Sequence, residues 1–332
     1  MPVYSTLNTL YTEILNCISG IHTAGIVRQF NSTMQSFYTS LDFQNLLKVS
    51  GDDNIKFLQG QLTCDLDQID ERTLGLGAAC NNKGRIYTSF RILKLEGDIY
   101  LCMPVGVLEN TRQVLQKFIP FYKAQMTDAT KDFQRIGVAG DKVEPLLESI
   151  YGMLPEAGQY SQLDNTTILH LQGEFPRYEL WLPWDAAMPD LTSLEAADRT
   201  CWQLLDLQQG LYFMPADDTE LFTPEEANLD INGFVSFDKG CYTGQEIVAR
   251  MHYRGKAGKR LFLVKAEGLT DSADAELVNS QGKALTKLSN TLFYKNNIYG
   301  LAVLKTATEF EDTSLQVKSG QVTAPAVITP FL

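Results

Sequence analysis

Cysteine is scarce in this 332-residue sequence, and none of it is paired in a way that suggests a metal or disulfide framework. No C-x-x-C pair occurs, and no Cys–His spacing matches a zinc site. The sequence therefore predicts no disulfide scaffold and no intrinsic metal site. The six cysteines are far apart, at Cys17, Cys64, Cys80, Cys102, Cys201 and Cys241.

Long apolar runs and a basic N-terminal segment are also missing. The first charged residue is Glu13, and no apolar run approaches the roughly 18 residues that span a bilayer. We therefore expect neither a signal peptide nor a membrane partner, and we expect the cytoplasm as the compartment.

Basic residues are outnumbered: 28 Lys plus Arg stand against 40 Asp plus Glu, for a net charge of -12. Such a surface repels polyanions on average, so the composition argues against direct nucleic-acid binding. Apolar residues at 44% and charged residues at 20% are typical of a folded globular protein. The length suits two or three domains.

Periodicity predicts a chain of mixed helices and strands. Apolar residues at helical spacing predict a helix over residues 7–18, followed by a polar connection over residues 21–40. Segments 76–80 and 85–93 flank the turn residues 81–84 and predict a β-hairpin. A second α+β unit is indicated over residues 133–190, and short strands beyond Arg260 predict a small β-barrel or sandwich.

The run from Lys239 to Glu246 contains the residues best suited to reactive or binding chemistry. Gly240 and Gly244 allow a tight turn around Cys241, and apolar residues after Gly244 fit one face of a helix. The helix N-terminus and Lys239 would both favour the thiolate, the form that attacks or binds metal. The alternative is that Cys241 is a small buried hydrophobic residue. His252 is the one histidine close in sequence to Cys241.

A basic stretch follows within eleven positions that contain no acidic residue. It could bind a carboxylate-rich ligand, such as a polyglutamylated cofactor, or a phosphate backbone. The alternative is a solvated linker between domains. The stretch comprises Arg250, Arg254, Lys256, Lys259 and Arg260.

The run Lys239–Glu246 resembles the signature of the YgfZ family, which reads K-G-C, an aromatic residue, any residue, then G-Q-E. The resemblance covers residues 41–262, and includes Gly51, residues 57–61, Thr63, Asp65, residues 83–85 and Gly210. Family motif positions in this chain are Lys239, Gly240, Cys241, Tyr242, Gly244, Gln245, Glu246 and Arg250.

The resemblance implies an α+β, GcvT-like folate-binding fold of two interlocked α+β modules plus a C-terminal small β-barrel. In these terms residues 1–40 would form an N-terminal helix and linker. Residues 41–125 plus 200–255 would form the folate-binding GcvT-like α+β domain, residues 126–199 an inserted α+β module, and residues 256–332 the barrel.

The resemblance also implies folate chemistry without group transfer. In the related T-protein of glycine cleavage, an acidic pair supports aminomethyl transfer, and the corresponding residues here are Thr88 and Ser89. Neither hydroxyl is anionic at neutral pH, so we expect no aminomethyltransferase activity. Folate-binding roles are implied for Trp202, Gln208 and Arg254, although relatives have Arg and Glu where this chain has Asp206 and Gln208.

The implied function is that of an accessory protein that binds tetrahydrofolate or a derivative such as folinic acid. It would support iron-sulfur cluster assembly or repair, with Cys241 engaging an iron-sulfur protein, an assembly factor or a small thiol. A link to tRNA modification would then be indirect, through iron-sulfur enzymes. Two alternatives remain: a folate-dependent one-carbon transferase of the aminomethyl type, and a partner-binding module without a small ligand.

Overall fold

The computed structural model describes residues 35–331 except for residues 174, 255–256, 271–273 and 307–314. All elements below belong to the unit that spans residues 36–332. The helix expected over residues 7–18 lies outside the described residues. Among the described residues, no helix is long and apolar enough to cross a membrane.

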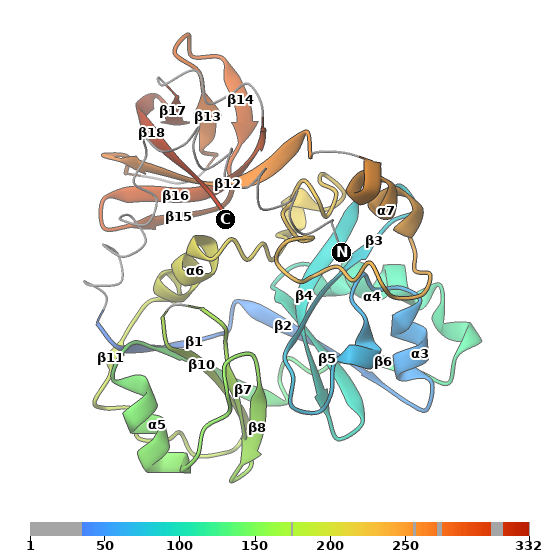
Figure 1. The fold of residues 1–332 in the computed structure, drawn as a ribbon. Coiled ribbons are helices and arrows are strands. Elements are labelled where there is room, and N and C mark those ends of the chain that lie inside the picture. Colours follow the sequence, from blue (N-terminus) through green and yellow to red (C-terminus); the bar gives the residue numbers. More distant parts are fainter. Residues whose placement is uncertain (1–34, 174, 255–256, 271–273, 307–314, 332) are drawn as a thin grey trace, which may run out of the picture. The chain divides into compact units, whose positions relative to one another are not determined.

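The first sheet has five strands in the order β3-β4-β5-β2-β6 (Figure 1). The hairpin expected around residues 81–84 is confirmed as β3 and β4, which pair antiparallel. Helices α3 and α4 contribute Phe57, Leu58 and Leu115 to the buried core beneath this sheet. The elements are β2 (Gln44–Ser50), α3 (Asn54–Gln59), η1 (Leu66–Gln68), β3 (Gly75–Cys80), β4 (Ile86–Leu95), β5 (Asp98–Pro104), α4 (Leu108–Gln116), η2 (Ile119–Phe121) and β6 (Gln125–Asp128).

The second sheet has six strands in the order β11-β1-β7-β10-β9-β8. Its first strand in the chain, β1, comes from residues expected to belong to the N-terminal connection, and it pairs with β7 and β11. Because β1 leads directly into β2 of the five-stranded sheet, one chain segment joins both sheets. The elements are β1 (Phe37–Ser40), β7 (Phe133–Ala139), α5 (Val143–Tyr151), β8 (Tyr160–Leu163), β9 (Thr166–His170), β10 (Arg177–Pro183) and β11 (Glu195–Ala196).

The third sheet has seven strands in the order β14-β13-β17-β18-β12-β16-β15 and forms a nearly closed barrel, since β14 comes back into contact with β16. Apolar side chains that alternate along β12 and β16 fill its interior. The strands are β12 (Lys259–Glu267), β13 (Glu276–Val278), β14 (Ala284–Lys287), β15 (Ser289–Tyr294), β16 (Asn297–Lys305), β17 (Gln316–Ser319) and β18 (Val322–Pro330).

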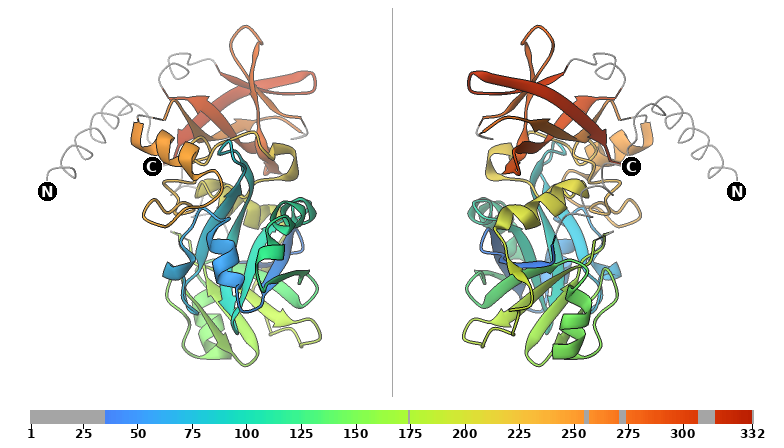
Figure 2. Two further views of the ribbon diagram at one scale, coloured as in Figure 1. Left: turned by 90° about the vertical axis from the view of Figure 1, so that its right-hand side faces the viewer. Right: turned by 90° about the vertical axis from the view of Figure 1, so that its left-hand side faces the viewer.

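Helix α6 (Arg199–Gln208) connects these parts. It packs against β15 and β16 of the barrel and against β1 of the six-stranded sheet, as the views of Figures 1 and 2 show. Asp198 caps its N-terminus by accepting a hydrogen bond from the Thr200 backbone N–H. The short helix η3 (Ala216–Asp218) follows, and α7 (Gln245–Arg254) begins directly after Gly244, as expected.

Candidate functional site

Lys239 anchors the loop that carries Cys241. We call residues 239–244 the cysteine loop. The Lys239 side chain is buried, and its Nζ donates hydrogen bonds to the backbone carbonyls of Gln59 (2.8 Å), Leu62 (2.8 Å) and Cys64 (2.7 Å). An ammonium has three donors, and all three are used here. Lys239 therefore holds the loop against the end of α3, instead of facing the Cys241 thiol as the sequence suggested.

The rest of the cysteine loop packs against two segments distant in sequence. The Thr243 N–H donates to the Gly60 carbonyl (3.2 Å), and the Thr243 hydroxyl donates to the Gln61 side-chain oxygen (3.1 Å). Gly244 has φ +87°, and a Cβ there would lie 2.4 Å from the Asn81 carbonyl oxygen. Only glycine fits this contact with the β3–β4 turn. Residues 57–61 and the turn at residues 81–84 thus form the surface against which the cysteine loop packs.

Cys241 points away from this surface into solvent. It is exposed, as is neighbouring Gly240, so the alternative of a small buried hydrophobic residue is wrong. Cys64 and Cys80 are instead buried, which raises the pKa of each thiol to about 12 and keeps both protonated at neutral pH. Among the five cysteines that the structure describes, Cys241 is the exposed one.

Tyr242 is the buried member of the cysteine loop. Its ring centroid lies 5.2 Å from Lys239 Nζ, and its hydroxyl has no hydrogen-bond partner among the described residues. Burial raises the pKa of Tyr242, so the phenol stays neutral. Lys239 and Tyr242 therefore fasten the loop from inside, while Cys241 between them faces outward.

Helix α7 presents polar side chains beside the cysteine loop, and three of those that the structure describes are engaged with one another or with Phe237. The ring of His252 stacks on Phe237, with the two centroids 3.6 Å apart. Glu246 and Arg250 form an exposed i,i+4 ion pair at 2.8 Å, and Gln245 starts the helix. No cluster of three or more potential metal ligands occurs in the described part of the chain.

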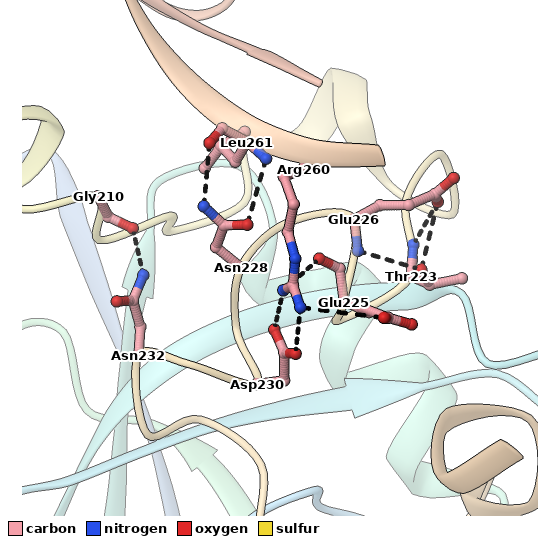
Figure 3. A network of polar contacts seen from close by, with 9 residues as sticks. All are labelled: Gly210, Thr223, Glu225, Glu226, Asn228, Asp230, Asn232, Arg260 and Leu261. Atoms are coloured by element: carbon pink, nitrogen blue, oxygen red, sulfur yellow. Dashed lines mark hydrogen bonds and ion pairs between the residues drawn. The ribbon is translucent and has the colours of Figure 1, made fainter. Parts of the chain in front are cut away.

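The basic stretch is not the free positive patch that its sequence suggested. Arg260 forms a bidentate ion pair with Asp230, with N–O distances of 2.5 and 2.9 Å (Figure 3). Lys259 lies 4.0 Å from Glu226. The acidic partners come from residues 225–230, which adjoin the stretch only in the fold. Lys256 and the side chain of Arg254 lie outside the described residues.

The same network ties the barrel to the end of α6 (Figure 3). The side-chain amide of Asn228 donates to the Leu261 carbonyl (3.0 Å) and accepts from the Leu261 N–H (3.2 Å). The Asn232 amide donates to the Gly210 carbonyl (2.8 Å). These bonds fix where β12 starts, and so place the barrel relative to α6.

A pocket of about 270 Å³ lies where the five-stranded sheet, α6 and the barrel meet. One face of α6 lines it with Arg199, Gln203 and Asp206, and β15 lines the opposite side with residues 290–292. Apolar side chains supply most of the remaining wall. These are Phe43, Met103, Pro104, Val105, Leu207, Leu211, Phe213 and Pro215, joined by Gln44, Arg91 and Cys102.

Two buried charged side chains give the pocket a polar end. Asp206 accepts a hydrogen bond from Arg177 (3.0 Å), and Arg91 donates to Glu179 (2.6 Å). Burial raises the pKa of Asp206, and the nearby guanidiniums of Arg177 and Arg91 counter this effect. Glu179 is the one described hydrogen-bond partner of the Arg91 guanidinium, so other N–H groups of this buried cation remain for a ligand.

Two of the residues implied for folate binding, Trp202 and Gln208, are not among the residues of this lining. Trp202 is fully buried, its ring facing Gly137 on one side and the Arg177 guanidinium at 5.0 Å. It occupies the position of a core aromatic residue. Gln208 also lies outside the lining. Arg91 was missed, although a lone arginine within the apolar run of residues 90–93 was a signal that could have revealed it.

The two hydroxyl residues in place of an acidic pair are also buried, and neither lines the pocket. The Ser89 hydroxyl donates to the Tyr212 carbonyl (2.7 Å) and accepts from the Met214 N–H (2.8 Å). It therefore holds the segment that carries Phe213. The Thr88 hydroxyl has no partner among the described residues.

Comparisons with known proteins place the chain in a family. No family model matches it. The tRNA-modifying protein YgfZ of Colwellia psychrerythraea is 30% identical over 237 residues, which cover 70% of this chain and 72% of that protein. The tRNA-modifying protein YgfZ of Yersinia pestis is 32% identical over 228 residues, which cover 67% of this chain and 69% of that protein.

The fold matches the glycine cleavage system aminomethyltransferase T from Bartonella henselae with a TM-score of 0.73. The match covers 91% of this chain and 87% of that one, at 15% sequence identity. The expected GcvT-like α+β fold with a C-terminal barrel is thereby confirmed. From its sequence relatives, the chain belongs to the YgfZ family.

Proposed function

We propose that this protein is a folate-binding accessory protein that supports iron-sulfur cluster assembly or repair. The observation that carries the proposal is the pocket between α6, the five-stranded sheet and the barrel, whose lining includes the buried charged residues Asp206 and Arg91. Its mostly apolar lining with a few polar groups is that of a small-molecule site.

The residues of the pocket fit a folate. A pterin presents N–H donors and a carbonyl acceptor on one edge, and a carboxylate beside a guanidinium complements both. Asp206 supplies the carboxylate, whose side chain is 11% exposed, and Arg91 supplies free N–H donors. Phe213, whose ring centroid lies 5.4 Å from the Arg91 guanidinium, adds apolar surface to the same lining. Bound there, tetrahydrofolate would supply a one-carbon carrier, which these residues bind and orient.

The buried hydroxyls argue against aminomethyl transfer. Thr88 and Ser89 are fully buried, and Ser89 is committed to two backbone groups of the segment 212–214. One observation favours the alternative of a one-carbon transferase: Asp206 places a carboxylate within the pocket, at a position other than the pair. A direct assay of one-carbon transfer to tetrahydrofolate decides between them, because turnover that Asp206→Asn abolishes would establish the transferase.

Cys241 is the residue that we propose engages an iron-sulfur client, an assembly factor or a small thiol. Its support is the exposed position on a loop that is anchored from beneath. The relatives are called tRNA-modifying proteins. We propose that this connection is indirect, through iron-sulfur enzymes that modify tRNA, because a net charge of -12 disfavours direct RNA binding. The cytoplasm is the compartment we propose.

Folate binding is tested by titrating folinic acid into the full chain, with binding heat and tryptophan fluorescence as readouts. Gln203→Phe adds bulk to the pocket rim and should weaken binding, whereas Gln113→Phe on α4 adds the same bulk outside the lining. If the wild-type protein gives neither binding heat nor fluorescence quenching, both the accessory and the transferase function are wrong, and the partner-binding module becomes the favoured function.

The role of the cysteine is tested in cells that lack the native protein. Cys241→Ala should fail to restore the activity of iron-sulfur enzymes, while Cys201→Ala, which removes a half-buried thiol of α6, should restore it. Full restoration by Cys241→Ala would reduce the residue to a surface position without function.

A further inference from the structure

The pocket is basic, although the chain is acidic. The charged residues of its lining are Arg91 and Arg199 against Asp206 alone, a surplus of one positive charge, whereas the whole chain carries -12. A cleft with the opposite sign to its surroundings concentrates ligands of the complementary charge. The lining therefore favours a ligand that is anionic as a whole.

The charges of this pocket lie at two ends of one helix face. Arg199, Gln203 and Asp206 are spaced i, i+4 and i+7, so they share the side of α6 that faces the pocket. At 1.5 Å of rise per residue, Arg199 lies about 10 Å along the helix from Asp206. Asp206 is buried, and Arg199 is exposed. The pocket therefore has a carboxylate at its deep end and a guanidinium at its rim.

The rim guanidinium has no bonded partner among the described residues, although the carboxylate of Asp198, its neighbour in sequence, is close enough to interact with its charge. Arg199 makes no ion pair and donates no side-chain hydrogen bond to any residue that the structure describes. Two buried arginines at the deep end differ, since Arg91 is paired with Glu179 and Arg177 with Asp206. Arg199 thus presents five N–H donors in a planar arrangement that matches a carboxylate.

We propose that Arg199 is a specificity-determining residue that pairs with a glutamyl carboxylate of folate, so that the pocket selects glutamate-bearing folates over pterins without a tail. This inference rests on the proposed folate function. The ring system would occupy the deep end at Asp206 and Arg91, and the benzoyl linker would follow the apolar wall toward Arg199. A ligand with a heterocycle at one end and a carboxylate at the other fits both ends at once.

The test compares two ligands on the full chain by calorimetry: folinic acid, which has a glutamyl tail, and tetrahydrobiopterin, a neutral pterin without one. Arg199→Gln should weaken folinic acid binding about fivefold, the worth of one exposed ion pair. The loss should shrink at high salt, because ions screen exposed charges. Tetrahydrobiopterin binding should not change. Arg112→Gln, which removes an exposed arginine of α4 outside the lining, should leave both affinities unchanged.

The outcomes separate this inference from the function on which it rests. Folinic acid that binds Arg199→Gln as tightly as wild type overturns the role of Arg199 and leaves folate binding intact. An equal loss for both ligands also overturns tail recognition, because it would mean that Arg199 shapes the whole pocket. Wild-type protein that binds no folinic acid overturns the proposed function itself.

Discussion

Replacing Gly244 by alanine should destabilise the protein and displace the loop that carries Cys241. Gly244 has φ +87°, a conformation that costs an L-residue about 1–2 kcal/mol. The added Cβ would lie 2.4 Å from the Asn81 carbonyl oxygen, which is a backbone atom and cannot rotate away. Such overpacking typically costs about 1–3 kcal/mol more. Together these effects predict a loss of about 2–5 kcal/mol in the free energy of unfolding.

The same loop provides a matched control. Gly240 is exposed, its φ is outside the left-handed region, and a Cβ there meets nothing within 4 Å. Gly240→Ala should therefore change stability by less than about 0.5 kcal/mol, as most surface substitutions do. Urea unfolding followed by tryptophan fluorescence measures both, since Trp181 and Trp202 are buried in the native protein. Equal stabilities of the two variants would refute the idea that the β3–β4 turn fixes the cysteine loop.

Three further results are expected. Lys239→Met should cost about 3 kcal/mol in urea unfolding because three backbone carbonyls, two of them buried, lose a charged donor. Lys259→Met, at an exposed position, should cost under about 0.5 kcal/mol. Arg260→Leu should cost about 3 kcal/mol, since it leaves the buried Asp230 carboxylate without its ion-pair partner. Hydrogen exchange should rise first in β12, and unchanged exchange would contradict the role of this ion pair in holding β12. Burial raises the pKa of Glu225 above its ordinary value of 4.5, so the native state binds the carboxyl proton more tightly than the unfolded chain does. The stability that this proton contributes is present below pH 4.5 and is lost as the pH rises through the native pKa. Glu225→Gln should remove that loss, so its stability relative to wild type should increase from pH 4 to pH 7, and a constant difference would contradict the assignment.

Features encoded by neighbouring residues could be predicted from the sequence. The β3–β4 hairpin follows from alternating side chains and the turn residues 81–84, and α7 follows from the apolar spacing after Gly244. Each pattern lies within one continuous stretch of sequence, so no distant partner is needed to recognise it. The glycines around Cys241 indicated an accessible thiol but left burial open as the alternative, and the structure shows it exposed.

Features that depend on distant segments could not be predicted. The basic stretch looked free because its acidic partners, such as Asp230, lie about 30 residues earlier and meet it only through the barrel. Lys239 looked like a partner of the next thiol, yet it binds carbonyls about 180 residues upstream. The pocket draws its lining from segments between Phe43 and Leu292, and no local pattern marks Arg91 or Asp206 as neighbours.

The placement of the two candidate sites bears on how they can work together. The pocket lining contains no residue of the cysteine loop. Strand β4 connects the two: it starts at the turn that supports Gly244 and carries Arg91 five residues after Ile86, about 17 Å along the strand. A ligand at Arg91 therefore binds at a different part of β4 from the turn that supports the cysteine loop. If folate and thiol act together, β4 is the element that connects the two sites, and folate should then change the reactivity of Cys241 without being consumed.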